Sequence, residues 1–338
     1  MKKPIRIGVL GLGQIALTAH LPGFDKTPHC QITALSTQRE ARGRKLAAQY
    51  GASAVFNDWR RLVRSPLVDA VTICLPNHLH APATLAALRA GKHVLVEKPM
   101  ALNLVEAAQM IQEAAKSHRV LMVHHNMRFD PALRCAGKLL RRGVAGPIHS
   151  FKCSLTHRGP ERWSPQANWF RDHRRSGGGV LMDLGVHVFD SLRYLLRDEV
   201  KSVVALTPRG MGRIEEHAVV MLEFRKGTVG TVHLSWKDTH YQNRYYLFCE
   251  KGALSVNLGK GDPVAVEARS QEGLHYPDLT PDCFKPALYE HFLDCVRTGK
   301  TPETSGAVGA AALAVAEGAY ASVRSRRWET IRPPKAQA

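Results

Sequence analysis

The 338-residue sequence has no uninterrupted run of about eighteen or more apolar residues, and we therefore expect no membrane-spanning segment. Paired spacings such as C-x-x-C are missing among its seven cysteines, which argues against a disulfide framework. Cys74 lies in the apolar run 70–75, a setting typical of a reduced, buried thiol. Because Gly and Pro are spread along the chain, collagen-like and low-complexity classes are excluded. These absences predict a folded, soluble protein of the cytoplasm.

Acidic residues are scarce, because 29 Asp and Glu stand against 47 Lys and Arg, a formal net charge of +18. Such an excess is typical of nucleic-acid-binding proteins. The basic residues, however, occur as scattered pairs such as Arg60-Arg61 and Arg174-Arg175, without a zinc-finger, basic-zipper or RNA-binding signature. We therefore expect a solvated basic surface and no nucleic-acid partner. An acidic small ligand is compatible with this charge.

The first part of the chain alternates short β-branched apolar runs with amphipathic helical patterns. We expect strands at 5–10, 31–35, 70–75, 93–96 and 120–123, and helices near 14–25, 39–50, 79–90 and 103–118. Strands that are apolar on both faces and separated by helices indicate a parallel sheet covered on both sides. Residues 1–123 are therefore predicted to form an α/β domain with a doubly wound (Rossmann) parallel sheet.

The pattern of expected strands and helices changes after Arg128-Phe129-Asp130-Pro131. Longer strand-like segments are expected at 147–157, 201–206, 213–224, 228–236 and 244–257, and helices at 131–142, 180–196 and 306–324. The residues Arg225 to Thr228 have the chemistry of a hairpin turn. Residues 124–338 thus read as an α+β domain with a mainly antiparallel sheet, and a cleft is expected between the two domains.

A glycine motif, G-x-G-x-x-A, occupies residues 11–16 where the first strand meets the first helix. Gly11 and Gly13 have no side chains, so the backbone can turn tightly and approach a pyrophosphate, and the helix N-terminus favours that anion. The strand-to-helix setting favours a dinucleotide site over an ordinary Gly-rich turn.

The second expected strand ends in Ser36-Thr37-Gln38-Arg39, where an NAD-selective protein would carry Asp or Glu for the ribose 2′-hydroxyl. Hydroxyls and a guanidinium bind a 2′-phosphate by charge-assisted hydrogen bonds. We therefore predict that NADP(H) is favoured over NAD(H), with Ser36, Thr37 and Arg39 around the phosphate. The alternative is that Arg39 only begins an exposed helix.

Two further segments carry candidate chemistry. Lys98, in Glu97-Lys98-Pro99, ends a strand at the sheet edge where open α/β folds bind ligands. Three glycines at 177–179 allow close approach of the backbone to a ligand, and a helix then places Asp183 and His187 at i and i+4 on one face.

The Asp183 and His187 pair has three possible meanings: a proton-transfer pair, two metal ligands, or a satisfied polar pair near a helix start. No further His or Cys has convincing ligand spacing, and His124 and His125, adjacent on a strand, would face opposite sides. We therefore expect no metal.

The order and spacing of five motifs resemble the glucose-fructose oxidoreductase, inositol dehydrogenase and MocA (Gfo/Idh/MocA) family of dinucleotide oxidoreductases. The likeness covers nearly the whole chain. The motifs are the glycine segment 11–16, Leu75-Pro76-Asn77-His78-Leu79-His80, Glu97-Lys98-Pro99, Trp169-Phe170-Arg171-Asp172 and the glycine-led segment with Asp183 and His187. One departure is His173-Arg174-Arg175, which replaces a less basic stretch found in many relatives.

The resemblance implies roles for matching residues. Lys98, commonly beside a cis peptide at Pro99, would contact the nicotinamide ribose and the substrate oxygen, His187 would be the acid/base, and Asp183 would be its partner. The cofactor would contact residues of the matching motifs, namely Gly11, Gly13, Gln14, Ile15, Leu75, Pro76, Asn77, His80, Glu97, Lys98, Trp169 and Arg171.

The resemblance also implies NADP(H)-dependent hydride transfer to or from a secondary alcohol or ketone of a sugar, cyclitol or sugar derivative. The alternative is a non-catalytic dinucleotide or sugar sensor of the same fold. Relatives commonly pair their open sheets, which implies a homodimer or homotetramer. Substrate contacts are expected from Lys98, His157, Asp183 and His187, and more weakly from Asn126, Arg128 and Tyr241, which border predicted strands.

Several arginines precede the expected catalytic helix, and they leave the charge of the substrate open. Arg158, Arg162, Arg171, Arg174 and Arg175 could hold a phosphorylated or nucleotide-linked sugar by bidentate contacts. A basic, solvated loop partly used for cofactor is an equally good interpretation.

Overall fold

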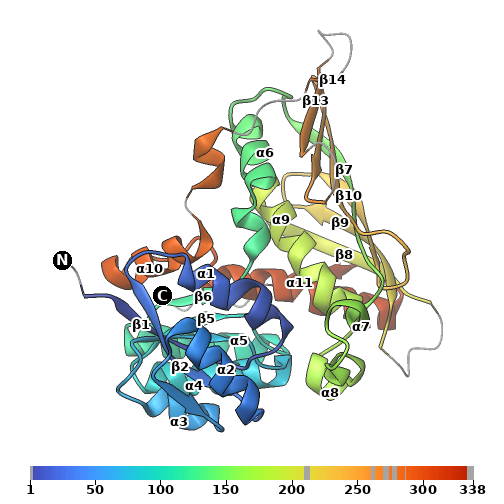
Figure 1. Cartoon of the computed structure of the whole chain (residues 1–338). Coiled ribbons are helices and arrows are strands. Elements are labelled where there is room, and N and C mark those ends of the chain that lie inside the picture. The colour runs from blue at the N-terminus through green and yellow to red at the C-terminus, as the bar shows by residue number, and fades with distance from the viewer. Residues whose placement is uncertain are drawn as a thin grey trace.

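The computed structural model describes residues 3–208, 214–259, 263–268, 274–275, 280–285 and 287–332, and it contains two separate sheets (Figure 1). Arg213, where the strand expected over 213–224 would begin, lies outside these ranges. The six-stranded sheet belongs to the N-terminal part and the nine-stranded sheet to the C-terminal part.

The N-terminal sheet is parallel throughout, with strand order β3-β2-β1-β4-β5-β6, which confirms the doubly wound prediction. The order in which strands are added reverses between β1 and β4, and at such a point the loops after the two strands diverge and open a crevice at their carboxyl ends. The strands are β1 (Ile5–Leu10), β2 (Cys30–Ser36), β3 (Ala54–Phe56), β4 (Ala70–Ile73), β5 (His93–Val96) and β6 (Leu121–Val123).

Helices follow these strands, as the alternating pattern predicts. They are η1 (Ala16–His20), α1 (Leu21–Asp25), α2 (Glu40–Tyr50), α3 (Trp59–Arg64), η2 (Asn77–Leu79), α4 (His80–Arg89) and α5 (Leu104–Ser117). Strand β3 and helix α3 were not predicted from the sequence. Both are too short to show a clear periodicity, and α3 buries only Trp59, Leu62 and Val63 while it carries three arginines.

The C-terminal sheet runs β14-β13-β12-β11-β7-β10-β9-β8-β15. It is mainly antiparallel, as expected, and the β7–β10 pair is parallel. The strands are β7 (Ile148–Thr156), β8 (Val200–Leu206), β9 (His217–Phe224), β10 (Val229–Ser235), β11 (Gln242–Cys249), β12 (Gly252–Asn257), β13 (Val264–Ala268), β14 (Leu274–His275) and β15 (Glu329–Thr330).

The turn predicted at 225–228 joins β9 to β10, with Gly227 at φ +94°. The single strand expected over 244–257 is wrong, because β11 and β12 form an antiparallel hairpin that turns at Glu250 and Lys251. These two residues have no strong turn signature, and β-forming residues continue on both sides of them.

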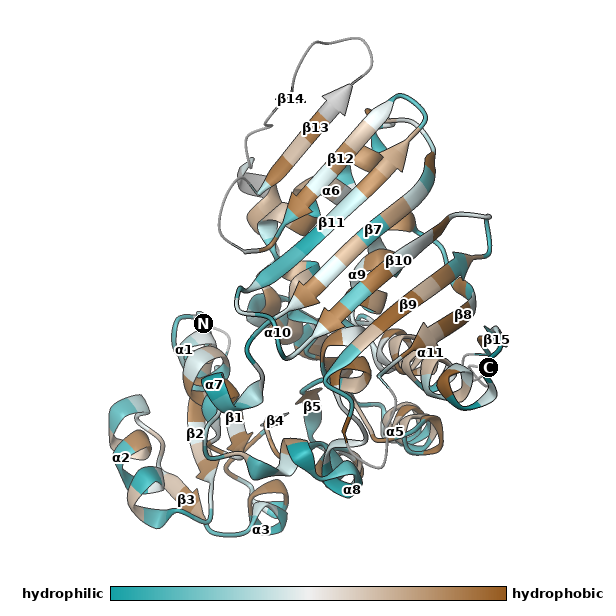
Figure 2. Cartoon of the chain, turned by 90° about the vertical axis from the view of Figure 1, so that its right-hand side faces the viewer, coloured by the Kyte–Doolittle hydropathy of each residue, from teal (hydrophilic) through white to brown (hydrophobic). Residues whose placement is uncertain are grey.

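Helices cover one face of the C-terminal sheet and leave the other face open (Figure 2). The C-terminal helices are η3 (Asn126–Phe129), α6 (Pro131–Arg141), α7 (Pro160–Trp163), η4 (Asn168–Arg171), α8 (His173–Ser176), η5 (Leu181–Gly185), α9 (Val186–Leu196), η6 (Pro281–Phe284), α10 (Leu288–Thr298) and α11 (Gly306–Ser325).

Helix α11 is long and apolar enough to cross a membrane by composition alone, which the search for apolar runs did not anticipate. In the structure 61% of that stretch is buried, because α11 packs against β8 and α9 on one side and against α5 and β6 on the other. Its alanines, including Ala310, Ala312 and Ala316, are buried and allow this close packing. The apolar composition thus fits a core helix that joins the two sheets.

Helix α10 was not expected, and it returns to the N-terminal part of the molecule (Figure 1). Its Tyr289 and Phe292 rings lie 4.8 and 6.3 Å from the ring of Phe24 in α1. The two parts of the chain are therefore connected by side-chain packing as well as by the backbone, which fixes the crevice between them.

Candidate active site

Two adjoining cavities occupy the crevice between the sheets, and most of the predicted site residues line them. The inner cavity, of about 440 Å³, is lined by Gly11, Gly13, Gln14, Ile15, Leu75, Pro76, Asn77, His80, Glu97, Lys98, His157, Trp169, Asp183 and His187, among others. The outer cavity, of about 680 Å³, shares the glycine motif and adds Ser36, Thr37 and Arg39. Asn126, Arg128 and Arg171 line neither cavity.

An ion pair between the two domains lines the inner cavity. The Lys98 ammonium, which follows β5, lies 2.7 Å from Asp183 Oδ1 and 3.0 Å from the Asp183 carbonyl oxygen in η5. The second carboxylate oxygen accepts a hydrogen bond of 3.1 Å from Trp236 Nε1. Both carboxylate oxygens are therefore engaged, and Asp183 orients Lys98 across the crevice.

His187 follows Asp183 by one turn and lines the same cavity. Its Nδ1 atom is buried and has no hydrogen-bond partner. Burial and the nearby Lys98 cation hold the pKa of His187 well below its usual value. The ring is therefore neutral near pH 7, and a neutral imidazole keeps one ring nitrogen that can accept a proton.

Glu97 holds the backbone of Lys98 and belongs to a buried hydrogen-bond network. One Glu97 oxygen lies 2.8 Å from both His20 Nε2 and His124 Nδ1, and the other accepts the Lys98 backbone N–H. His20 also contacts Thr72 at 2.8 Å, and His124 contacts Tyr289 at 3.3 Å. The strand end that carries Lys98 is thereby held rigidly.

Burial and hydrogen-bond partners set the pKa values of Glu97 and His20 in this network. Burial alone would raise the pKa of Glu97, but the charge and hydrogen bonds of His124 and His20 hold it well below its usual value. Burial and His124 lower the pKa of His20 to about 4.

The donor atoms of His20, Glu97 and His124 also lie close enough to hold a metal ion, as do those of His217, His233 and Asp238. The absence of a metal stays a prediction.

Asn77 and His80 brace the loops that border the inner cavity. Asn77 Nδ2 donates to the Ser176 carbonyl at 2.8 Å, which ties the first domain to the glycine segment of the second. The ring nitrogens of His80 lie 2.7 Å from the carbonyl oxygens of Pro99 and Leu75. The Lys98-Pro99 peptide is cis, as the resemblance implies.

The two glycine segments have different surroundings. A Cβ added to Gly13 would meet no atom within 4 Å, so this backbone is open to the groove, as a pyrophosphate requires. A Cβ on Gly178 or Gly179 would lie 1.9 Å from the Tyr320 hydroxyl or the Glu215 carbonyl oxygen. The expectation that glycines 177–179 approach a ligand is thus corrected for Gly178 and Gly179, because protein atoms occupy that space.

Glu215 holds the beginning of the helix that carries Asp183 and His187. Its buried carboxylate accepts the Gly179 N–H at 2.9 Å, the Leu181 N–H at 3.1 Å and the Tyr320 hydroxyl. Its backbone carbonyl accepts the Val180 N–H at 3.0 Å. One residue therefore satisfies the free N–H groups at this helix start, a role otherwise filled by local caps.

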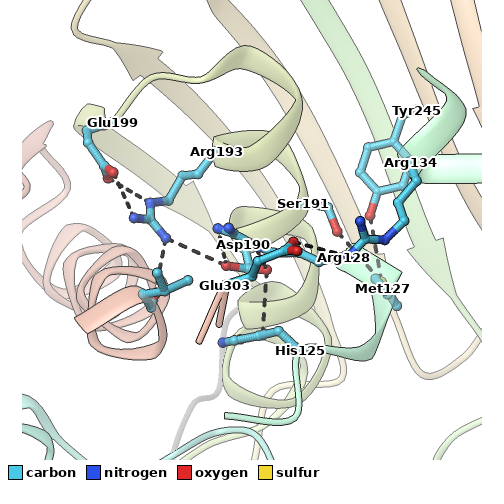
Figure 3. A network of polar contacts seen from close by, with 11 residues as sticks. His125, Met127, Arg128, Arg134, Asp190, Ser191, Arg193, Glu199, Tyr245 and Glu303 are labelled. Atoms are coloured by element: carbon cyan, nitrogen blue, oxygen red, sulfur yellow. Dashed lines mark hydrogen bonds and ion pairs between the residues drawn. The ribbon is translucent and has the colours of Figure 1, made fainter. Parts of the chain in front are cut away.

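Arg128 serves a buried network beside the site, which explains why it does not reach the cavity (Figure 3). Its guanidinium binds both oxygens of Asp190 at 2.7 Å, and Arg193 lies 3.6 Å from the same carboxylate. Burial would raise the pKa of Asp190, but His125, Arg128 and Arg193 hold it low. Because a buried carboxylate needs such partners, Arg128 stabilises α9 and is not free to bind a ligand.

Arg171, expected at the cofactor, is also engaged elsewhere. Its guanidinium forms ion pairs with Glu161 and Glu216 and lies 5.4 Å from the centre of the Trp236 ring. Its neighbours Trp169 and Phe170 stack at 3.8 Å and line the inner cavity. The motif therefore contributes its aromatic rings to the cavity and its cation to the surrounding loops.

Sequence reasoning missed other residues of the site. The apolar wall of the inner cavity includes Met127, Leu155, Phe170 and Leu184, and Tyr241, ranked as a weaker candidate, lines it too. His20 and Trp236 bind the carboxylates of Glu97 and Asp183. No local motif marks these residues, because they reach the site only through the tertiary fold.

Comparisons with known proteins agree with this architecture. Residues 5–125 match a family model described as "Oxidoreductase family, NAD-binding Rossmann fold", and residues 133–255 match the "GFO/IDH/MocA C-terminal domain".

Individual relatives cover almost the whole chain. The myo-inositol 2-dehydrogenase of Thermotoga maritima is 30% identical over 96% of this chain and 97% of its own length. The dTDP-3,4-didehydro-2,6-dideoxy-alpha-D-glucose 3-reductase of Streptomyces antibioticus is 29% identical over 87% of this chain and 89% of its own. The aldose-aldose oxidoreductase of Caulobacter crescentus, crystallised with glycerol, superimposes with a TM-score of 0.87 at 27% identity, over 97% of this chain and all of that one.

The contrast between the glycine segments can be tested by adding one methyl group. Gly178→Ala should lower the free energy of unfolding by roughly 2–3 kcal/mol, because the new Cβ collides with Tyr320. The matched control Gly13→Ala should unfold near the wild-type temperature but bind a dinucleotide more weakly. Thermal unfolding and nucleotide titration measure both effects. Unchanged stability of Gly178→Ala would contradict the packing role.

Proposed function

Because the chain belongs to the GFO/IDH/MocA family of oxidoreductases, we propose that it transfers a hydride between NADP(H) and a secondary alcohol or ketone of a sugar, cyclitol or sugar derivative. Its relatives establish that the protein is an NAD(P)-dependent enzyme that acts on CH–OH groups. The proposal concerns the substrate class, the preference for NADP(H) and the roles of individual residues.

The observation that carries the catalytic proposal is the meeting of Lys98, Asp183 and His187 in one cavity. These residues come from both domains, and the cavity also contains the open glycine backbone expected for a dinucleotide. A dinucleotide or sugar sensor would not need a lysine, a carboxylate and a neutral imidazole together. Their joint presence favours catalysis over sensing.

Each group has a chemical task that its surroundings support. A bound nicotinamide supplies or accepts the hydride. Neutral His187 accepts the hydroxyl proton of an alcohol, or returns it to the oxygen of a ketone. Lys98, held by Asp183, stabilises the negative charge that develops on that oxygen. Asp183 is therefore assigned to orient Lys98, while His187 remains free to face the substrate.

Removal of the reactive groups tests these roles. Lys98→Met and His187→Ala should each lower turnover by at least about a hundredfold, while dinucleotide binding stays measurable by fluorescence titration. Near-normal turnover in both variants would contradict the assignments.

The pH profile supplies an independent measurement. Because the pKa of His187 lies well below 6.5, the base form persists on acidification, and kcat/KM for alcohol oxidation should stay level from pH 8 through pH 6.5. A decline centred at an ordinary histidine pKa would argue against His187 as the base.

The preference for NADP(H) rests on the walls of the outer cavity. Ser36 and Thr37 at the end of β2 line it beside Arg39, Arg42 and Arg60. The Arg39 guanidinium donates to Gln166, so it already lies over the cavity. The carboxylate of Asp58 also lines this cavity, but it caps α3 through the Arg60 N–H and pairs with the Arg60 side chain. Hydroxyls and guanidinium groups there favour a 2′-phosphate.

The cofactor proposal predicts kcat/KM with NADPH well above that with NADH. Arg39→Ala should lower the NADPH value at least about tenfold and leave the NADH value nearly unchanged, because only NADPH carries the phosphate. Arg44→Ala is the matched control, since Arg44 pairs with Glu40 on the exposed face of α2. A wild-type preference for NADH, or equal loss with both cofactors, would overturn the proposal.

We also propose a homodimer, or a tetramer built from it, that pairs the open face of the C-terminal sheet. Val219, Met221, Val229, Tyr246 and Phe248 project from its strands with 39–48% of their surface exposed. Figure 2 shows that no helix covers the open face of this sheet. Such a patch favours association.

Light scattering should give twice or four times the monomer mass of 37.4 kDa, and Met221→Glu should lower the measured mass. A wild-type monomer would exclude this arrangement.

We also propose a division of labour between the two domains and a cytoplasmic location. Residues 1–123 serve as the cofactor domain and residues 124–338 as the substrate and oligomerisation domain, with α10 returning to pack on the first. A cytoplasmic location is supported by the seven cysteines, all of which are free thiols.

A further inference from the structure

We infer that the substrate of this enzyme is uncharged, a free sugar or cyclitol without a phosphate or nucleotide group. The inference rests on the proposed function and narrows its substrate class. It follows from the positions of the lysine and arginine side chains around the crevice and from their partners. The matching relatives include both an inositol dehydrogenase and a reductase of a nucleotide-linked sugar, so family membership leaves this question open.

The inner cavity offers little net positive charge to a substrate. Among the described residues that line it, Lys98 is the one lysine or arginine, and its ammonium is paired with the Asp183 carboxylate at 2.7 Å. His187 is neutral because burial and Lys98 lower its pKa. A phosphate in this cavity would face the Asp183 carboxylate without a free cation, which makes its desolvation unfavourable.

Arg171, which adjoins lining residues of this cavity in the chain, is neutralised by carboxylates. Arg171 follows two lining residues, but Glu161 and Glu216 both bind its guanidinium. Glu216 also pairs with Lys237 at 3.2 Å. The group therefore contains two cations and two anions, and it carries no net charge that could attract a phosphate.

Four other guanidinium groups lie at the opposite end of the crevice. Arg39, Arg42, Arg60 and Arg175 line the outer cavity, where the phosphates of the cofactor are expected. Arg158, a further candidate for substrate phosphate, instead donates to the Thr239 carbonyl at 2.8 Å. Of the arginines that suggested an acidic substrate, Arg175 thus lies at the cofactor end, while Arg158 and Arg171 bind oxygen atoms of the protein.

What remains at the substrate end suits a polyol. Trp163, Trp169, Phe170 and Tyr241 supply ring faces and edges against which the C–H face of a sugar can pack. His157, whose Nδ1 accepts the Gly159 N–H, adds a polar group to the same wall. Aromatic surface with a few polar groups recognises hydroxyls and C–H bonds without requiring a charge.

Matched substrate pairs test the inference on the full-length protein with NADP⁺. Myo-inositol is compared with myo-inositol 1-phosphate, and D-glucose with D-glucose 6-phosphate and UDP-glucose. We expect kcat/KM to be at least about a hundredfold higher for the neutral member of a pair that reacts. Equal or faster reaction of a phosphorylated or nucleotide-linked member would overturn the inference and leave the dehydrogenase proposal intact.

Binding separates failure of the inference from failure of the proposed function. Calorimetry on the cofactor-loaded enzyme should show tighter binding of the neutral members than of their phosphates, whether or not turnover occurs. Binding of the phosphorylated members alone contradicts the inference. No turnover of any pair, nor of a wider panel of neutral sugars and cyclitols, with intact cofactor binding would contradict the proposed function.

A variant that releases Arg171 provides a gain-of-function measurement. The double substitution Glu161→Gln and Glu216→Gln removes both carboxylates from this guanidinium. Affinity for the phosphorylated member should rise at least about tenfold, with less than about a twofold change for the neutral member. Glu113→Gln, which removes a carboxylate from Arg89 between α4 and α5, is the matched control. An unchanged preference in the double variant would show that Arg171 pairing does not set substrate charge.

Discussion

The ion pair between Lys98 and Asp183 is the constraint on which the site depends, because Lys98 follows a strand of the first sheet and Asp183 lies in η5 of the C-terminal part. A buried ion pair is favourable only if the two charged groups lie at hydrogen-bonding distance and their remaining donors and acceptors also have hydrogen-bond partners. Glu97 fixes the Lys98 backbone from one side, and Trp236 holds the second Asp183 oxygen from the other. The packing of α10 and α11 across both domains maintains this distance.

The two ends of the crevice differ in charge. Guanidinium groups that line only the outer cavity suit the phosphates of a cofactor, whereas carboxylates neutralise the cations beside the inner one. A net charge of +18 therefore says little about the substrate. Position decides its effect, because a charge paired at short range exerts little field on a third group.

Much of the fold could be predicted from sequence, since long elements show their period clearly. The five strands expected in the first domain and the helices near 104–117 and 306–325 are present. Missed elements were short, such as β3 and α3, or depended on distant partners, such as α10 against Phe24. The hairpin at Glu250 and Lys251 escaped because neither residue favours a turn strongly.

The sequence by itself determined the types of chemistry available: a glycine motif at a strand end, a lysine at another strand end, and Asp183 and His187 one turn apart. These are local patterns, set by backbone geometry over a few residues. Only the tertiary structure decided the partners. Asp183 binds Lys98, 85 residues away, and Arg128 and Arg171 bind carboxylates of the protein. A buried carboxylate pairs with whichever cation the topology brings within reach, and spacing along the chain cannot reveal which one that is.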